Sequence, residues 1–325
     1  MASESHEQNE TSAAQHAMRR HYRAAAEAVF VTMLWSSSWV IIKFGLQELS
    51  PLIFSGLRYV IAALILLTIV TMRSEYRTSI GEKPRSWWLL MAAYGVVFIS
   101  ITQGAQFVGL DLLDTISVSI ILNLTPIVVL VLGAVLLKEV PTLLQVLLII
   151  LVVVGAMIYF YPFDFDASAT LGVLVMIVGL IANALSSIIG RYVNKQHAAP
   201  SIVITAASMM IGSFILLAAG VLLEGIPALS PLSIFYILWL SVVNTAFAFT
   251  LWNSAMQTLR AVDTTIINST MLPQITILSI IFLGAMPTSL EWFGLILLVF
   301  CVAAVQVLQA KKTAREQKAL PTVRP

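Results

Sequence analysis

The chain alternates between long apolar runs and short polar or charged breaks. Ten runs hold roughly 20 predominantly apolar residues each, enough for an α-helix to cross about 30 Å of hydrocarbon. They cover residues 26–46, 51–72, 86–108, 115–137, 141–161, 169–192, 200–223, 231–254, 263–284 and 288–310. Proline, serine and charged residues mark the breaks, as in Ser50-Pro51 and the segment 73–85. The pattern predicts an all-α integral membrane protein with ten transmembrane helices.

The composition agrees with a membrane protein. Hydrophobic residues make up 59% of the 325 residues and charged residues only 10%, far from the averages of soluble domains. The single cysteine, Cys301, cannot form an intrachain disulfide, so it indicates no oxidising compartment. Residues 1–25 are polar and charged, and we expect a tail there rather than a cleaved signal peptide.

The placement of Lys and Arg predicts the orientation. If successive breaks lie on alternate sides of the membrane, 16 of the 18 Lys and Arg residues fall on the side of both termini. Lys43 falls on the other side, and Arg58 lies inside the second run. Because positive residues are enriched in cytoplasmic loops, we expect both termini to be cytoplasmic.

The second half of the chain repeats the layout of the first. Residues 112–161 and 262–308 each hold two apolar runs separated by a short break, and Pro126 and Pro273 lie 147 residues apart. With five helices per half, the second half must insert upside down, as is typical of secondary transporters. The predicted units are a cytoplasmic tail (1–25), a five-helix repeat (26–161), an extracytoplasmic linker (162–168), a second five-helix repeat (169–310) and a cytoplasmic tail (311–325).

Polar side chains concentrate in the first, third, fourth, sixth, eighth and ninth runs. Residues three, four or seven apart share a helix face, so the polar rows predict one cavity lined by these six helices. The candidate substrate-binding residues are Trp35, Ser38, Trp39, Lys43, Arg58, Gln103, Gln106, Ser119, Asn123, Asn183, Ser187, Trp252, Asn253, Gln257 and Asn268. For single Ser, Thr and Asn residues, hydrogen bonds that only hold helices together remain the alternative.

Tryptophans, cations and prolines sharpen this hypothesis. Trp35 and Trp39 lie away from the interfacial belt where Trp usually sits, which favours a pocket. Arg58, about 10 Å inside its run, is a candidate partner for a substrate carboxylate, as is Lys43. The alternatives for Arg58 are a pair with Asp114 or a snorkelling side chain.

Pro126 and Pro273 lie roughly 15 to 17 Å deep in the membrane. Each lacks a backbone N–H and so frees the carbonyl four residues earlier in its helix. Both are candidate gating residues, and a static bend is the alternative.

Motifs of soluble enzymes are missing from the sequence. It has no phosphate-binding Gly-rich loop and no cluster of metal ligands, and its four His lie in tails or loops. We therefore predict that the protein is not an enzyme and has no cofactor or metal site. No carboxylate falls at mid-membrane, which argues against an Asp or Glu proton relay.

Three segments resemble a known family: LWSSSWVIIKFGLQELSPLIFSGLRYVIAALIL, LNLTPIVVLVLGAVLLKEVPTLLQVLLIILVVVGAMI and NTAFAFTLWNSAMQTLRAVDTTIINSTMLPQ. Over residues 26–310 the chain is similar to the EamA branch of the drug/metabolite transporter superfamily. The resemblance implies two five-helix inverted repeats and export of small metabolites or drugs across a bacterial inner (plasma) membrane. The family positions that the chain matches are Trp35, Lys43, Arg58, Pro126, Glu139 and Pro273. Met286 stands where the second half usually repeats an acidic residue.

These observations together predict a secondary transporter. It would export small organic metabolites or drugs, amino-acid-like or amphipathic, by alternating access. An importer or exchanger of the same fold is one alternative, and a non-transporting membrane scaffold or partner-binding subunit is another. The expected partners are a small-molecule substrate and the lipid bilayer, with no nucleic acid, and the expected state is a monomer or homodimer.

Overall fold

The computed structural model describes residues 2–81, 83–137, 142–195, 199–256, 258–259 and 267–319. These residues form helices and connections, with no strand among them, which confirms the predicted all-α class. The elements are α1 (Ala2–Gly45), α2 (Pro51–Met72), α3 (Ser74–Gly81), α4 (Arg85–Gly95), η1 (Val96–Gln103), α5 (Gly104–Leu112), α6 (Thr115–Asn123), α7 (Thr125–Leu137), α8 (Leu143–Phe160), α9 (Ala167–Lys195), α10 (Ser201–Glu224), α11 (Pro231–Ser241), η2 (Val242–Phe247), α12 (Ala248–Met256), α14 (Met271–Leu283) and α15 (Ser289–Ala319).

Nine helical stretches of the described chain are long and apolar enough to cross a membrane. They are Met18–Gly45, Pro51–Met72, Arg85–Leu112, Thr115–Leu132, Leu143–Phe160, Ala167–Gly190, Ser201–Glu224, Pro231–Trp252 and Ser289–Leu308. They coincide with nine of the ten predicted runs. The remaining run, 263–284, is described only from residue 267, as the shorter apolar helix Ile267–Leu283. The protein is therefore a multi-pass membrane protein.

Two spans contain a π-helical segment. η1 lies between α4 and α5 in the third span, and η2 lies between α11 and α12 in the eighth. In each segment a threonine hydroxyl donates to the carbonyl five residues earlier, Thr102 to Val97 over 2.9 Å and Thr245 to Leu240 over 2.8 Å. A π-helical turn holds an extra residue and is frequent at functional sites. It changes which side chains of these spans face the interior.

The fourth span and the predicted ninth run, 263–284, are both broken near their prolines. The break between α6 and α7 falls at Leu124, two residues before Pro126. The proline cannot donate to the Leu122 carbonyl, and the Thr125 hydroxyl donates to that carbonyl instead. In the described part of the run 263–284 the helix is interrupted at Thr270, directly before α14. The fourth span therefore consists of two rods, α6 and α7, that meet at Leu124.

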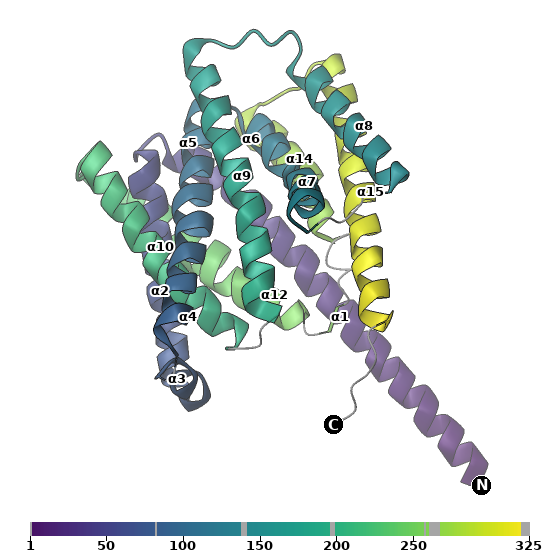
Figure 1. Ribbon diagram of the computed structural model, residues 1–325. Coiled ribbons are helices and arrows are strands. Elements are labelled where there is room, and N and C mark those ends of the chain that lie inside the picture. Colours follow the sequence, from purple (N-terminus) through teal and green to yellow (C-terminus); the bar gives the residue numbers. More distant parts are fainter. Residues whose placement is uncertain are drawn as a thin grey trace.

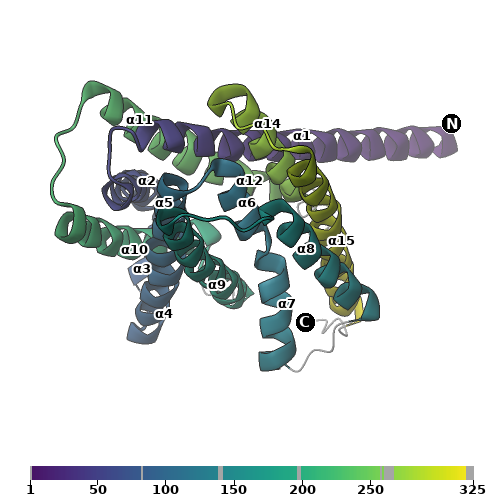
Figure 2. The same ribbon diagram turned by 90° about the horizontal axis from the view of Figure 1, so that it is seen from above.

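Glycines allow two helix pairs to approach closely. A Cβ atom on Gly56 of α2 would lie 2.7 Å from the Cα of Leu217 on α10. A Cβ atom on Gly294 of α15 would lie 2.6 Å from the carbonyl oxygen of Gly155 on α8. Backbone atoms cannot yield locally as side chains do, so only glycine fits at these contacts. Figure 2 shows the two pairs at opposite edges of the bundle.

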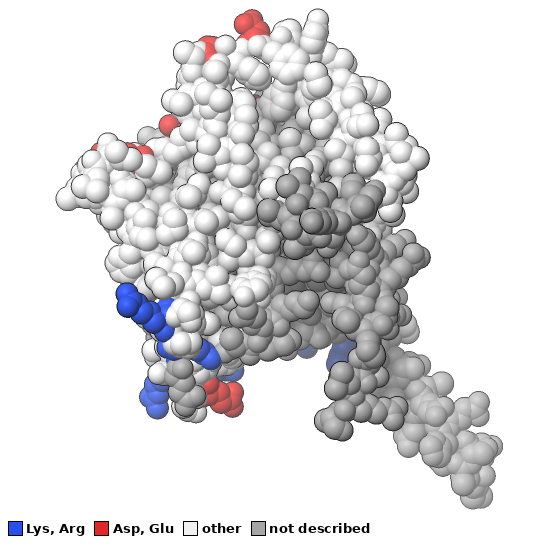
Figure 3. Space-filling model, viewed as in Figure 1, with Lys and Arg blue, Asp and Glu red and all other residues white. Residues whose placement is uncertain are grey.

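The two ends of the bundle carry different charges. α1 begins and α15 finishes toward the same end (Figure 1). Lys and Arg side chains gather at that end, near α3 and α4, whereas most of the visible Asp and Glu lie toward the opposite end (Figure 3). We call the end where α1 begins the basic end. The asymmetry agrees with the distribution of charges along the sequence.

Candidate functional site

A cavity of about 730 Å³ lies inside the bundle. Its described lining residues are Trp35, Ser38, Trp39, Arg58, Tyr59, Phe98, Thr102, Gln103, Gln106, Leu122, Asn123, Thr125, Pro126, Val129, Asn183, Ser187, Asn244, Phe249, Asn268, Met271, Ile275 and Gln306. They come from both halves of the chain. The volume is typical of small-molecule sites, which range from about 300 to 1,000 Å³.

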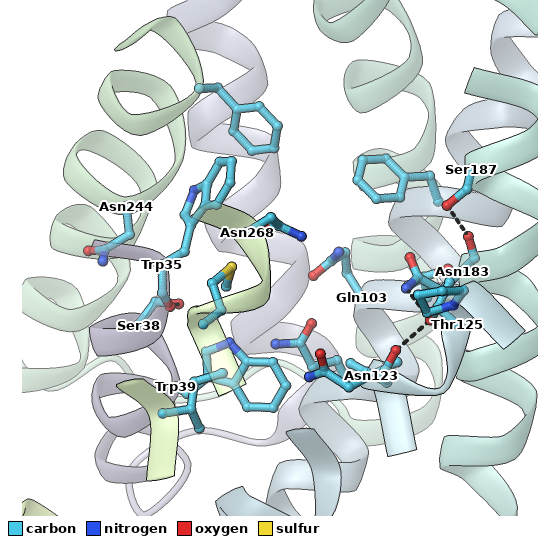
Figure 4. A pocket seen from close by; sticks show the side chains of 18 of the residues that line it. Trp35, Ser38, Trp39, Gln103, Asn123, Thr125, Asn183, Ser187, Asn244 and Asn268 are labelled. Carbon is cyan, nitrogen blue, oxygen red and sulfur yellow. Dashed lines mark hydrogen bonds between the residues drawn. The ribbon is translucent and has the colours of Figure 1, made fainter. Parts of the chain in front are cut away.

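Most of the predicted binding residues surround this cavity. Those that line it are Trp35, Ser38, Trp39, Arg58, Gln103, Gln106, Asn123, Asn183, Ser187 and Asn268, together with the predicted gating residue Pro126. Figure 4 shows how several of these side chains converge from different helices. Their roles in binding and gating stay predictions.

Aromatic rings form one corner of the cavity. The Trp35 ring packs against Phe249, with centroids 5.5 Å apart and planes at 57°. On the same ring, Trp252 packs at 5.1 Å and 50°, but Trp252 itself is not among the lining residues. Trp252 therefore supports Trp35 from behind. Trp39, from the same helix as Trp35, is 7% exposed and lies deeper in the wall.

Amides and hydroxyls form the polar part of the wall. Asn183 of α9 donates its Nδ2 to the hydroxyl of Thr125 at the start of α7 over 2.9 Å, as Figure 4 shows. Across the cavity, the Tyr59 hydroxyl donates to Oε1 of Gln103 over 2.7 Å. Asn123 donates its Nδ2 to the Ser119 carbonyl of its own helix over 2.8 Å. These bonds fix the side chains at the cavity surface.

Arg58 is the buried cation of the cavity wall. Its side chain is 5% exposed, and Nε donates to the Thr245 hydroxyl over 3.1 Å. Its guanidinium carbon lies 5.1 Å from the Tyr59 ring centroid and 5.9 Å from that of Phe107. Asp114, considered above as its partner, instead accepts from the backbone N–H of Ser117 at 2.9 Å and caps α6.

Lys43 lies outside the set of lining residues. Its Nζ donates to the carbonyl of Leu110 over 2.5 Å and to that of Leu113 over 2.9 Å. These carbonyls lie in the last turn and at the end of α5, where no backbone N–H of the same helix is available to bond to them. The ammonium therefore ties α1 to α5 at the end of the bundle opposite the basic end.

Five other predicted positions are not among the lining residues or cannot be placed. Ser119 is fully buried and its hydroxyl donates to the Ile116 carbonyl over 2.7 Å, a bond within its own helix. Pro273 is not among the lining residues either. Glu139, Gln257 and the side chain of Asn253 lie outside the described part of the chain.

The sequence prediction omitted several polar lining residues, namely Tyr59, Thr102, Thr125, Asn244 and Gln306. Asn244 donates to the Leu34 carbonyl and to the Ser37 hydroxyl, while Gln306 accepts from the Ser269 hydroxyl over 2.7 Å. Gln306 lies in the apolar stretch 292–308, in which it is the only amide, and that isolation was the available signal. For the other four, the sequence shows only a polar residue at membrane depth, which does not indicate whether the side chain faces the cavity.

Two of the described lining residues, Ser187 and Asn268, are exposed. Ser187 lies in the second half of α9, which finishes at the basic end (Figure 1), and Asn268 lies in the short helical stretch directly before α14. The lining residues Trp39 and Gln106, each six residues before the end of its helix (α1 and α5), are buried. On the far side, opposite the basic end, α6 packs against α14, whereas on the basic side α7 packs against α9. Among the described helices of these two runs, α6 and α14 are therefore in contact at the far side.

The chain matches known proteins along most of its length. A family model described as the EamA-like transporter family matches residues 24–161 and 170–306. YoaV of Bacillus subtilis (strain 168), an uncharacterized transporter, is 26% identical over 233 residues, which cover 69% of this chain and 76% of YoaV. An uncharacterized transporter of Archaeoglobus fulgidus is 22% identical over 228 residues, covering 69% and 76% respectively. One solved crystal structure superposes with a TM-score of 0.61 at 16% identity, over 89% of this chain and 99% of its own, which shows the fold alone.

Proposed function

Because the chain belongs to the EamA-like transporter family, we propose that it is a secondary transporter that exports small organic solutes by alternating access. The membrane is the bacterial inner membrane. The observation that carries the proposal is the cavity of about 730 Å³, lined by both halves of the chain, whose exposed lining residues Ser187 and Asn268 support an opening toward the basic end. A passage open to one side at a time is what alternating access requires.

The proposed topology has ten spans in two inverted five-helix repeats. In this topology the described helix Ile267–Leu283 belongs to the ninth span. Two separate family matches, at 24–161 and 170–306, support the duplication. The collection of Lys and Arg at the basic end supports cytoplasmic termini (Figure 3). With this orientation, the cavity faces the cytoplasm and takes up solute for export.

The broken spans define the proposed second state, in which the cavity opens to the side opposite the basic end. The far halves, α6 and α14, pack together, so solute can leave only after they separate. α7 is joined to α6 through the break at Leu124, and it closes the cytoplasmic side when it swings toward the cavity. The breaks near Pro126 and Pro273 supply the pivots, because a proline removes the hydrogen bond that would keep each span rigid.

The lining residues give no support for proton coupling through a carboxylate. Among the described lining residues none is Asp or Glu. We therefore infer that solute moves down its own gradient or by exchange with a second solute. In that case an imposed pH gradient leaves the accumulation of solute unchanged.

Flux into proteoliposomes tests the proposal. The purified protein is reconstituted and given a panel of amino acids, carboxylic acids and amphipathic drugs, with and without a pH gradient. We expect saturable flux of at least one solute, loss of that flux in Trp35→Ala, and normal flux in Trp292→Ala, since Trp292 is 38% exposed and does not line the cavity. Both variants remove one indole ring, so a difference in flux between them reports the contribution of the cavity and not the general loss of a tryptophan.

The contrary outcomes are equally specific. No flux of any solute, together with a protein that copurifies stoichiometrically, would favour the scaffold alternative. Transport only toward the cytoplasmic side would favour an importer. Normal flux in folded Trp35→Ala would remove the aromatic corner from the solute path.

A further inference from the structure

A guanidinium buried in a membrane span needs a partner for its charge. Arg58 lies about 10 Å inside its span, is 5% exposed and lines the cavity. A charged side chain at this depth costs several kcal/mol unless it is paired or solvated. Yet no ion pair joins Arg58 to any residue that the structure describes. The energetic cost of burying the Arg58 charge is therefore offset by solvation in the cavity and by the ligand that the cavity binds.

The neighbours of Arg58 fix the guanidinium without neutralising it. Nε donates to the Thr245 hydroxyl over 3.1 Å, and that hydroxyl is itself held by the Leu240 carbonyl. The rings of Tyr59 and Phe107 flank the guanidinium carbon at 5.1 and 5.9 Å. All of these partners are neutral. They leave the two terminal nitrogens, Nη1 and Nη2, without a hydrogen bond to a described residue.

Nη1 and Nη2 form the planar fork that binds a carboxylate through two parallel hydrogen bonds. A lysine at this place would present only a point charge. Lys43, the other cation in the described spans near the cavity, has its ammonium bound to two backbone carbonyls. Arg58 alone among the described lining residues is charged. The described lining therefore carries a net positive charge, which favours anions over cations.

The rest of the wall sets the form of the ligand. Beside the polar groups the lining contains the rings of Trp35, Phe98 and Phe249 and the aliphatic chains of Met271 and Ile275. A ligand that satisfies both parts carries one carboxylate and an apolar or aromatic body. Resting on the proposed function, we propose that Arg58 anchors the carboxylate of the solute and makes the transporter selective for organic monoanions.

Three probes of matched shape test the selectivity. Phenylacetate, phenylacetamide and phenethylamine share the same ring and differ in being anionic, neutral and cationic at neutral pH. Kd is measured for each by calorimetry with the full-length protein in nanodiscs. Because hydrogen bonds to charged groups contribute about 1.5–3 kcal/mol, we expect phenylacetate to bind about tenfold to hundredfold more tightly than either of the others.

Variants assign the selectivity to Arg58. In Arg58→Gln the Kd of phenylacetate should lie within about threefold of the Kd of phenylacetamide. Arg58→Lys should still bind phenylacetate more tightly than phenylacetamide, but with most of the difference in Kd lost. Arg77→Gln is the matched control, because Arg77 lies exposed on α3, away from the cavity, and it should keep the full preference. If Arg58→Gln does not fold, the wild-type series and Arg58→Lys still decide.

Equal affinity for the three probes, tighter binding of the amine, or no saturable binding of phenylacetate would overturn the proposal. So would an unchanged preference in Arg58→Gln. These results are distinct from a failure of transport. Flux without a preference for the anion would contradict the role of Arg58 but support transport. A preference for the anion without flux of any solute would support the role of Arg58 but contradict transport.

Discussion

Two cations in apolar spans, Lys43 and Arg58, show what decides the role of a single residue. Both lie in runs that predict membrane helices, and both were equal candidates for a substrate carboxylate. Lys43 is two residues from the end of α1, so its ammonium reaches free carbonyls at the end of α5. Arg58 lies deeper and faces the cavity. Depth within the helix, rather than charge, separates the two.

The Lys43 contacts lead to a prediction about the side opposite the basic end. Lys43→Met keeps the length of the side chain but removes both hydrogen bonds to the α5 carbonyls, which we expect to lower the free energy of unfolding by about 1.5–3 kcal/mol. Hydrogen exchange should also accelerate at the end of α5 and the start of α6. Mass spectrometry of exchanged peptides measures this. Exchange rates equal to those of wild type would show that the contact does not hold that side closed.

The sequence predicted much of the cavity surface at the residue scale, and its failures have physical reasons. Polar residues inside apolar runs were predicted to face a cavity, and Ser38, Gln103 and Asn183 are among its lining residues. The same logic included Ser119, whose hydroxyl is satisfied within its own helix. It also included Trp252, which packs behind Trp35. Sequence spacing indicates on which face of its helix a residue lies, but not whether a neighbouring side chain separates that residue from the cavity.

At the scale of elements, hydropathy was a good guide because the membrane demands long apolar helices. The predicted runs and the described spans agree closely, and proline signalled the breaks in the fourth and ninth spans. The π-helical segments η1 and η2 were not predicted, since their apolar composition is the same as that of an α-helix. Their position brings Thr102, Asn244 and Thr245 to the interior. Three of the residues missing from the prediction, Thr102, Asn244 and Tyr59, lie on or against these segments.

The close contact of α2 with α10 gives a prediction for helix packing. Gly56→Ala would place a Cβ atom 2.7 Å from the Leu217 Cα, so the helices must move apart. We expect a loss of about 1–3 kcal/mol of stability, as in other overpacked cores. Gly81→Ala is the control, because a Cβ on Gly81 meets nothing within 4 Å. Thermal unfolding in detergent measures both, and equal midpoints for the two variants would contradict the close contact.

For the molecule as a whole, charge asymmetry, duplication and the cavity combine into one account. The family matches cover two successive stretches of similar length, and both contribute lining residues to one cavity. Among the described elements, α6 of the first half packs against α14 of the second. Sequence predicted the duplication, because each half repeats the same order of runs. It could not predict that α6 and α14 pack together, since the order of runs does not determine how helices are placed relative to each other.

The accessibility of Ser187 tests the central claim, a solute path that faces the cytoplasm, most directly. Ser187→Cys is made in a Cys301→Ser background, which removes the single native cysteine. A membrane-impermeant maleimide is then applied from either side of sealed vesicles, with and without a solute that the protein transports. The account predicts labelling from the side of the termini only, slowed by the solute. Labelling from the opposite side, or a rate that the solute does not change, would contradict it.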